Sequence, residues 1–290
     1  MLSVLAIECG IDPDYEGRLI TSATKLGLQV LIVAWDAREQ RFCLSDGQGS
    51  ITERLVPDPS LRNVQVWFHG SIQACVAAQE HTRWQVHAPW DALKCSSYYP
   101  KLQGFVGPDT ALFQKGWRIL PLGDFINERD LLVDVLYETD TLFVRPDTND
   151  KVFSGGCVSK STWDENLKNI LFYEPPMDTL IVIARPRQVV SEARFLVVNH
   201  RLVTGSYYKV GSQAMQLRVQ QYSPVWQQAQ RLLDVCLTNA FHPSYSWVLD
   251  VAEDSRGVSE IIEVGGSAYC GMYACDTDAF LTALYGGPET

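Results

Sequence analysis

An apolar segment that runs directly into a loop of cations and glycines is the feature that most constrains the fold of this chain. Residues Thr141–Val144 predict a β-strand, and the loop that follows contains Arg145, Lys151, Gly155 and Gly156. Cationic side chains supply charge for a polyphosphate, and glycine lets backbone N–H groups approach phosphate oxygens closely. The alternative is an ordinary turn at the edge of a sheet. The stretch therefore predicts a sheet whose strand leads either into a phosphate-binding loop or into a plain turn.

The composition limits the classes of protein to which the chain can belong. Its 290 residues are 46% hydrophobic and 20% charged, which is typical of a globular protein long enough for two or three structural units. The net charge of -10 argues against general binding of nucleic acids or anionic membranes, because either partner requires a basic face. No stretch is long enough to span a bilayer, and residues 1–7 predict a strand rather than a signal peptide, since they lack a basic region.

The spacing of cysteines and histidines argues against disulfides and against structural zinc. The eight cysteines are scattered without a Cys-x-x-Cys pair, and the five histidines lack a His-x-x-x-His spacing. This distribution favours reduced, mostly buried thiols, so we expect a cytoplasmic protein.

The first third of the chain alternates between predicted strands and helices. Apolar segments at 2–7, 28–34 and 64–69 predict strands, and residues 14–25 and 71–80 predict helices. This alternation predicts a small parallel α/β unit. No Gly-x-Gly-x-x-Gly motif follows the first strand, so dinucleotide binding there has little support.

The rest of the chain mixes both element types. Residues 88–108, rich in proline and aromatic residues, predict a connector with a short helix. The later predicted elements are a helix at 130–137, a strand covered on both faces at 179–184, a hairpin at 195–204 with Asn199-His200 as its turn, a helix that starts with Ser223 and Pro224, and a helix at 277–285.

Two carboxylates, Asp250 and Glu263, lie in apolar segments on either side of a turn-like stretch at 253–257. A hairpin centred between residues 256 and 257 places them directly opposite each other, with Cβ atoms about 5 Å apart. Such carboxylates repel unless a cation lies between them, and Mg²⁺, with oxygen contacts of roughly 2.1 Å, also takes phosphate oxygens. The alternative is a solvated acidic face of the hairpin. The same register turns four apolar residues to the other face: Leu249, Val251, Ile262 and Val264.

Glu192 and Arg194 share one face of a predicted strand, because they are two residues apart. They form either a surface ion pair of little energetic value or a nucleotide site. In the second case Glu192 accepts from ribose hydroxyls and Arg194 reaches a phosphate. Arg185 and Arg187, near the end of the strand at 179–184, either line the same cleft or are solvated loop cations.

Taken in order, these segments resemble the ATP-grasp superfamily, and more narrowly its clade with two arginines and one lysine at the phosphate site. The resemblance runs through Phe143–Gly156, Glu192–Val198, Val203–Tyr208, Trp247–Ala252 and Ile261–Val264. It implies an α+β/α/β architecture in which two α+β subdomains grip ATP and a small α/β domain precedes them. We expect the preceding domain at 1–110 and the ATP-grasp domain at 111–290.

The resemblance also implies a role for each candidate residue. The phosphate-binding and therefore catalytic positions are Arg145, Lys151 and Arg194, with Gly155 and Gly156 in the phosphate loop. The strand that meets adenine through its backbone carries Ile183 and Ala184, the ribose contact is Glu192, and the Mg²⁺ ligands are Asp250 and Glu263.

One position departs from the family pattern. The family usually places asparagine two residues after the second metal-binding acid, and Gly265 stands there in this chain. One ligand to a second Mg²⁺ is therefore missing, and a water molecule or Ser267 is the expected substitute.

The function that the resemblance implies is ATP- and Mg²⁺-dependent ligation of a carboxylate to an amine or thiol through an acylphosphate. Such chemistry depends mainly on positioning and on neutralising charge. The expected partners are ATP, a carboxylate substrate and an acceptor that is an amino acid, a peptide or a modified macromolecule, with no membrane. Two alternatives remain open at this point: a catalytically impaired protein that binds ATP and a partner, and a phosphotransferase on the same scaffold.

Overall fold

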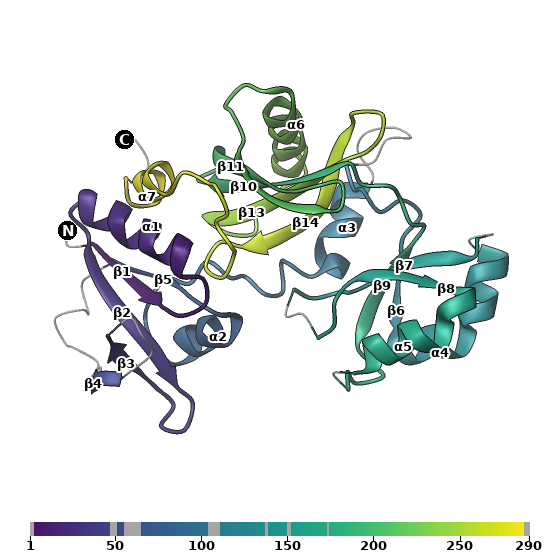
Figure 1. Cartoon of the computed structure of the whole chain (residues 1–290), viewed down its shortest axis with the longest axis horizontal. Coiled ribbons are helices and arrows are strands. Elements are labelled where there is room, and N and C mark those ends of the chain that lie inside the picture. Colours follow the sequence, from purple (N-terminus) through teal and green to yellow (C-terminus); the bar gives the residue numbers. More distant parts are fainter. Residues whose placement is uncertain are drawn as a thin grey trace.

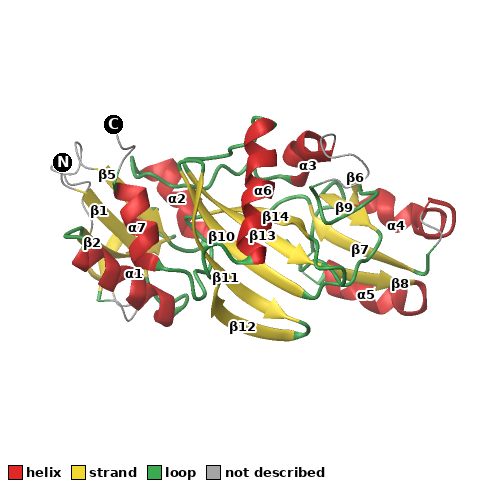
Figure 2. Cartoon of the chain, turned by 90° about the horizontal axis from the view of Figure 1, so that it is seen from above, coloured by secondary structure: helices red, strands yellow, loops and turns green. Residues whose placement is uncertain are grey.

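Three β-sheets lie in a row along the long axis of the molecule (Figures 1 and 2). The structure is a computed structural model that describes residues 3–46, 51–54, 65–103, 111–136, 139–149, 152–172 and 174–286. The N-terminal sheet is at one end, the central sheet follows, and a smaller sheet forms the other end (Figure 1).

The N-terminal sheet has the strand order β4-β3-β2-β1-β5. Its strands are β1 (Ser3–Glu8), β2 (Gln29–Asp36), β3 (Arg41–Ser45), β4 (Ile51–Arg54) and β5 (Gln65–His69). The predicted parallel unit is confirmed, because β1 pairs in parallel with both β2 and β5. Strands β3 and β4 extend it in antiparallel fashion and were not predicted.

Helices α1 (Pro13–Lys25) and α2 (Ile72–His81) pack on this sheet and start within one residue of the predicted positions. The Asp12 carboxylate accepts from the Asp14 N–H at 3.2 Å, and the Ser71 hydroxyl accepts from the Ala74 N–H at 3.1 Å. Both contacts satisfy backbone donors that the first turn of a helix leaves unpaired.

The central sheet has the order β12-β11-β10-β13-β14. Its strands are β10 (Ser191–Val198), β11 (Arg201–Val210), β12 (Gln213–Arg218), β13 (Ser246–Glu253) and β14 (Ser259–Gly266). Asn199 and His200 form the predicted turn between β10 and β11, with φ of 47° and 64°. Helix α6 (Pro224–Thr238) covers one face, and α3 (Cys95–Gln103) joins the same core through Tyr98 and Tyr99.

The opposite face of the central sheet meets the N-terminal sheet. Leu196 and Val248 share a core with Leu5 of β1 and with Phe280 of α7 (Thr277–Tyr285). Figure 1 shows α7 beside α1, although they lie at opposite ends of the chain. Since α3 belongs to the central core and residues 104–110 lie outside the description, the expected division between 110 and 111 stays a prediction.

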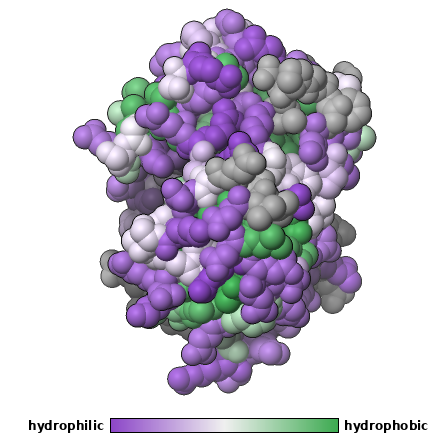
Figure 3. Space-filling model, turned by 90° about the vertical axis from the view of Figure 1, so that its right-hand side faces the viewer, coloured by the Kyte–Doolittle hydropathy of each residue, from purple (hydrophilic) through white to green (hydrophobic). Residues whose placement is uncertain are grey.

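The small subdomain, residues 118–184, contains the third sheet, with the order β6-β9-β7-β8. Its strands are β6 (Arg118–Pro121), β7 (Thr141–Pro146), β8 (Gly156–Ser159) and β9 (Leu180–Ala184), and its helices are α4 (Leu122–Leu131) and α5 (Trp163–Leu171). The strands predicted at 141–144 and 179–184 are confirmed. Figure 3 views this end of the molecule and shows a mostly hydrophilic surface with smaller hydrophobic patches.

The helix predicted at 130–137 begins earlier than expected. Helix α4 starts at Leu122, and residues Leu132–Leu136 continue it as a π-helical stretch. Gly123 lowers the local helix propensity, so the sequence does not predict a helix that starts at Leu122. The glycine allows a close approach, because a Cβ there would lie 3.3 Å from the Met177 carbonyl oxygen.

Two further sequence expectations can be compared with the structure. All eight cysteines are free, and Cys157 is the exposed one. None of the helices in the described ranges combines the length and apolar composition that crossing a bilayer requires.

Candidate nucleotide site

A cavity of about 470 Å³ lies between the small subdomain and the central sheet. Its volume is in the range of small-molecule sites. Three parts of the chain line it. The small subdomain contributes Phe143, Arg145, Asn149, Phe153 and Gly155, and the central sheet contributes Glu192, Lys209, Ile262 and Glu263. The segments that join the two, residues 111–117 and 185–190, contribute Phe113, Gln114, Arg185 and Arg187.

The structure brings together only some of the predicted site residues at this cavity. Arg145, Gly155, Glu192 and Glu263 line it. Gly156 begins β8 beside a second, smaller pocket. Lys151 lies outside the described residues. The four other residues are close by: Ile183, Ala184 and Asp250 are buried, and Arg194, which pairs with Asp250, is partly buried.

Ile183 and Ala184 are fully buried, and the segment after them lines the cavity instead. Ile183 pairs with both β6 and β7, and Ala184 pairs with Phe143 of β7. Arg185 and Arg187 follow directly and line the cavity. The adenine contact predicted at Ile183 and Ala184 thus stays a prediction, and the cavity itself begins one residue later.

Arg145 reaches from the small subdomain across to β14. Its Nη2 atom lies 3.3 Å from Glu263 Oε1 and donates to Asn149 Oδ1 at 3.2 Å, while Nη1 donates to the Ile262 carbonyl at 3.1 Å. The Asn149 amide in turn donates to the Val264 carbonyl at 2.6 Å. One guanidinium therefore joins both walls of the cavity.

Gly155 lets the loop before β8 pack closely on Arg145. A Cβ at this position would lie 3.0 Å from the Arg145 Cβ, whereas a Cβ at Gly156 would meet nothing within 4 Å. Only the first of the two predicted glycines is therefore required by a close approach.

Arg194 and Asp250 form a two-pronged ion pair on adjacent strands. Nε donates to Oδ1 at 2.9 Å and Nη2 donates to Oδ2 at 2.7 Å. The guanidinium also lies over the rings of Tyr208 and Tyr273, at 5.7 and 5.2 Å from their centroids. Asp250 is 2% exposed, and burial raises its pKa above the ordinary value although the Arg194 charge opposes this shift. Planar bidentate pairing of this kind is among the stronger charge-assisted contacts.

Asp250 and Glu263 are paired across the β13–β14 hairpin, as the sequence predicts. The predicted turn centre and the predicted orientation of Ile262 are wrong. Past Asp250 the register shifts, so that Val251 pairs with Ile261 and the turn is centred on residue 256. Ile262 is the extra residue of this β-bulge, which directs it into the cavity together with Glu263. The other three apolar residues, Leu249, Val251 and Val264, face the core as predicted.

The donor set around Asp250 and Glu263 fits Mg²⁺ bound to a nucleotide. Among the described residues no third aspartate, glutamate, histidine or cysteine joins them in a cluster. Two carboxylates nevertheless suit Mg²⁺, since it commonly takes its other ligands from phosphate and water. Ser267, the expected substitute for the missing asparagine, is fully buried, and its carbonyl faces the His69 ring at 3.2 Å.

Lys209 is a cavity residue that sequence reasoning missed. Its ammonium lies 2.6 Å from Glu192 Oε1. A regular ladder from the Asn199-His200 turn would place Tyr207 opposite Glu192. Two register shifts between β10 and β11 bring Lys209 there instead. Asn149 was also missed, although it belongs to the loop that the sequence singled out.

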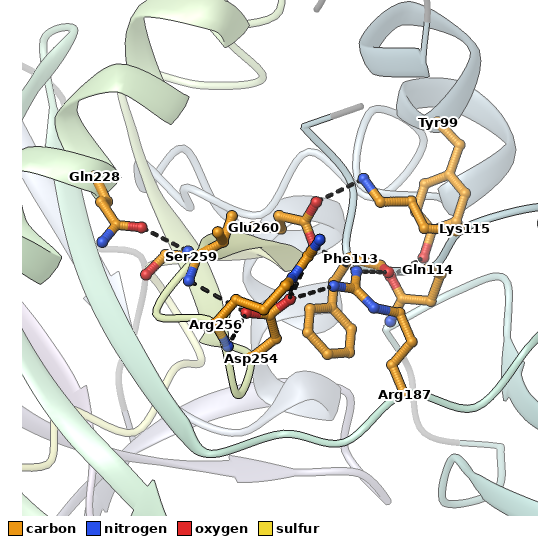
Figure 4. A network of polar contacts seen from close by, with 11 residues as sticks. Tyr99, Phe113, Gln114, Lys115, Arg187, Gln228, Asp254, Arg256, Ser259 and Glu260 are labelled. Carbon is orange, nitrogen blue, oxygen red and sulfur yellow. Dashed lines mark hydrogen bonds and ion pairs between the residues drawn. The ribbon is translucent and has the colours of Figure 1, made fainter. Parts of the chain in front are cut away.

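The open question about Arg187 is answered by its contacts. It lines the cavity, and it donates to the Phe113 carbonyl at 2.6 Å and to Asp254 at 2.9 Å. It also pairs with Glu260, and its guanidinium carbon lies 4.2 Å from the centroid of the Phe113 ring (Figure 4). Arg187 is therefore a paired cavity residue and not a solvated loop cation.

The cavity lies between two α+β subdomains, and Arg145 of one subdomain faces Glu263 of the other. A comparison of the sequence with protein families leads to the same kind of domain. A family model of the ATP-grasp domain, that of family 3 in the clade with two arginines and one lysine, matches residues 116–284. The chain belongs to this family. The predicted ATP-grasp fold and the predicted clade are thereby confirmed.

Solved structures share this ATP-grasp fold at low sequence identity. A D-cycloserine synthetase superposes with a TM-score of 0.62 at 12% identity, covering 97% of this chain and 98% of that one. The D-alanine–D-alanine ligase from Bacillus anthracis gives 0.55 at 11% identity, with 92% and 87% covered. The N5-carboxyaminoimidazole synthetase from Staphylococcus aureus gives 0.56 at 12% identity, with 98% and 77% covered. No curated protein sequence matches the chain significantly.

Proposed function

We propose that this ATP-grasp protein is an ATP- and Mg²⁺-dependent ligase that joins a carboxylate to an amine or thiol through an acylphosphate. The observation that carries the proposal is the cavity between the subdomains, where Arg145 and Glu263 face each other and Glu192 lies on the same wall as Glu263. Family membership and the ligase names of the structural neighbours support it. The ligase from Bacillus anthracis has also been crystallised with ATP.

In the proposed complex the triphosphate lies toward Arg145 and Gly155, and Lys151 of the same loop contributes a second cation. Glu192 accepts from the ribose hydroxyls. The base lies toward the joining segments. There the cavity is lined by Phe113 of the first joining segment and by the apolar side chain of Ile262 of β14. Aromatic and apolar walls suit a nucleobase, and fixed cations suit phosphoryl transfer, because it gains most from positioning and electrostatics.

Asp250 and Glu263 would hold Mg²⁺, and the bound ion would supply positive charge that neutralises the phosphates. Both carboxylates are paired with arginines, Asp250 with Arg194 and Glu263 with Arg145. Phosphates and metal together would replace these partners, since phosphates attract the arginines and Mg²⁺ attracts the carboxylates. Arg194 would thereby become available as the second phosphate-binding arginine. We therefore expect nucleotide and metal to bind cooperatively.

The acceptor is proposed to be an amino acid, a peptide or a modified macromolecule, and the site of action the cytoplasm, where free cysteines stay reduced. Gly265 is the one observation that favours the rival of a catalytically impaired ATP-binding protein. A phosphotransferase on this scaffold would instead transfer the phosphoryl group to an acceptor and release a stable phosphorylated product.

The test is ADP release measured across pairs of carboxylates and amines or thiols, with mass detection of products. The ligase proposal predicts ADP release that requires both partners and a product whose mass equals their sum minus water. A phosphorylated product that accumulates without an amine would favour the phosphotransferase. Tight ATP binding without turnover in any pair would favour the impaired protein.

A further inference from the structure

Two segments join the small subdomain to the rest of the molecule, and both are held on the turn end of the β13–β14 hairpin. Connector 1 is residues 111–117, and connector 2 is residues 185–190. Figure 4 shows the polar contacts that hold them. We call Lys115, Arg187, Asp254 and Glu260 the connector cluster.

Glu260 is the centre of the connector cluster. It is 3% exposed, and it pairs with a cation from each connector: Lys115 Nζ at 2.6 Å and Arg187. A second buried carboxylate, Asp254, accepts from Arg187 at 2.9 Å. Buried carboxylates are costly unless they are paired, so these contacts restrict both connectors to one arrangement.

Backbone hydrogen bonds link the same segments. The Phe113 N–H donates to the Ile261 carbonyl, and the Ile261 N–H donates to the Ala111 carbonyl, both at 2.8 Å. The Val190 N–H of connector 2 donates to the Glu253 carbonyl at 2.8 Å. Connector 1 thus extends the central sheet beside β14, while connector 2 runs along the end of β13.

The connector cluster lies directly beside the cavity. Glu260 precedes Ile262 and Glu263 on β14, and both of these line one wall. The opposite wall, with Arg145 and Gly155, belongs to the small subdomain, which is joined to the rest of the chain through the two connectors. Any change in the path of the connectors would therefore change the separation of the two walls.

We propose that Glu260 and Arg187 are positioning residues that fix both connectors to the central sheet and thereby set the separation of the cavity walls. This inference rests on the proposed function only where ATP binding is its readout. Arg187 also lines the cavity, so Glu260, which is not among the lining residues, is the cleaner test.

The experiment compares Glu260→Gln with Arg256→Gln. Glutamine keeps the shape of Glu260 but removes the charge that both connectors share. Arg256 is the matched control, because it pairs with the same Asp254 at 2.7 Å but has a side chain that is 65% exposed. Amide hydrogen exchange at Phe113, Ile261 and Val190 is measured without nucleotide, and ATP binding with Mg²⁺ is measured by calorimetry.

We expect Glu260→Gln to speed exchange at these amides at least tenfold and to raise the Kd of ATP about tenfold, while Arg256→Gln changes neither. Turnover at saturating ATP should fall less than affinity, which a general loss of folding would not produce. Arg187→Lys should recover part of the affinity lost in Arg187→Gln, since lysine keeps the positive charge that pairs with Glu260 and Asp254.

Lys115→Gln is the milder variant if Glu260→Gln does not fold. It should speed exchange at Phe113 and raise the Kd of ATP in the same direction. Unchanged exchange and affinity in a folded Glu260→Gln or Lys115→Gln protein would overturn the inference, as would equal effects in Arg256→Gln. If the wild-type protein binds no ATP, the proposed function fails, and the exchange measurement still decides the role of the connector cluster.

Discussion

At the scale of single residues, the candidate site is organised as two arginine–carboxylate pairs. Each of the two proposed phosphate-binding arginines faces a proposed metal ligand: Arg145 faces Glu263 and Arg194 faces Asp250. Opposite charges so arranged keep the buried Arg145 and Asp250 paired without ligands. The consequence is that neither ATP nor Mg²⁺ alone should bind well.

The substitution Asp250→Asn tests this exchange of partners. It releases Arg194 from its ion pair, so ATP without Mg²⁺ should bind several-fold more tightly than to wild type. ATP with Mg²⁺ should bind about tenfold more weakly, because a metal ligand is lost. Calorimetric titrations in Mg²⁺ and in chelator measure both effects. The variant should also be less stable by up to about 3 kcal/mol, since a partly buried cation loses its partner.

Asp278→Asn is the control for that measurement, because Asp278 pairs with Lys25 at 3.2 Å and its side chain is 52% exposed. It should leave both affinities unchanged. Equal affinity of wild type and Asp250→Asn for metal-free ATP would mean that Arg194 does not reach the phosphates.

The adjacent glycines Gly265 and Gly266 differ in the space around them. A Cβ at Gly265 would meet only the Val248 Cβ, at 3.7 Å, whereas one at Gly266 would lie 2.5 Å from the Tyr269 ring. Neither is among the glycines with positive φ. Gly265→Asn should therefore fold normally, lower the Mg²⁺ concentration for half-maximal ADP release, and raise the rate. Gly266→Ala should lose roughly 1–3 kcal/mol of stability, measured by denaturant unfolding.

An unchanged Mg²⁺ titration in Gly265→Asn would show that this position does not contribute to the metal site. Loss of stability in that variant would instead contradict the space seen beside Val248.

At the scale of elements, bulges decide which side chains enter the cavity. The β13–β14 bulge turns Ile262 inward, and two shifts between β10 and β11 place Lys209 opposite Glu192. A hairpin read as a regular ladder pairs Asp250 with Glu263 correctly only because the predicted turn centre, half a residue past the observed one, offsets the bulge between that pair and the turn. It misplaces Lys209, because both shifts lie between the turn and Glu192.

The loop between β7 and β8 offers a prediction at the same scale. Gly155→Ala would bring a methyl group to 3.0 Å from the Arg145 Cβ, and Gly156→Ala would meet open space. We expect Gly155→Ala to weaken ATP binding about fivefold to tenfold, roughly 1 kcal/mol, by displacing the loop from Arg145. Gly156→Ala should bind ATP like wild type in the same titration. The reverse order of effects would remove Gly155 from the phosphate site.

At the scale of the whole molecule, His69 joins the N-terminal sheet to the central sheet. It is fully buried at the end of β5, and its ring contacts the Tyr15 hydroxyl at 3.1 Å and the Ser267 carbonyl at 3.2 Å. Burial lowers the pKa of His69 from 6.5 to about 4. The folded protein therefore holds this histidine neutral where the unfolded chain would already protonate it.

Stability should consequently fall as the pH drops from 6.5 toward 4. Below pH 6.5 the unfolded chain takes up a proton that folded His69 accepts only near pH 4, so protons favour unfolding in that window. The expected loss is on the order of 3 kcal/mol. Burial also lowers the pKa of His87 to about 4, so two histidines make stability depend on pH in this window. His69→Gln should therefore remove about half of the histidine contribution to the change of unfolding free energy with pH. Denaturant unfolding at several pH values measures it, and an unchanged slope would contradict the assignment.

Much of the fold could be predicted from sequence because its signals are local. Apolar runs predicted β1, β2, β5, β7 and β9, and the capping pair Ser223-Pro224 placed the start of α6. Strands β3, β4, β6, β8 and β12 and helix α5 were missed. Strand β12 shows why. It is an exposed edge strand, so its sequence lacks the alternation of apolar and polar residues that would predict a strand.

The sequence by itself determined the family, the order of most strands and helices, and that Asp250 and Glu263 lie on the two strands of one hairpin. These follow from residues that are neighbours along the chain or across one turn. Only the tertiary structure decided which arginine faces which carboxylate, and that Glu260 holds both connectors. Those contacts join segments far apart in sequence, and small register shifts redirect the side chains that make them. The periodicity of a sequence indicates which residues share one face of a strand. It does not indicate which distant group packs against that face.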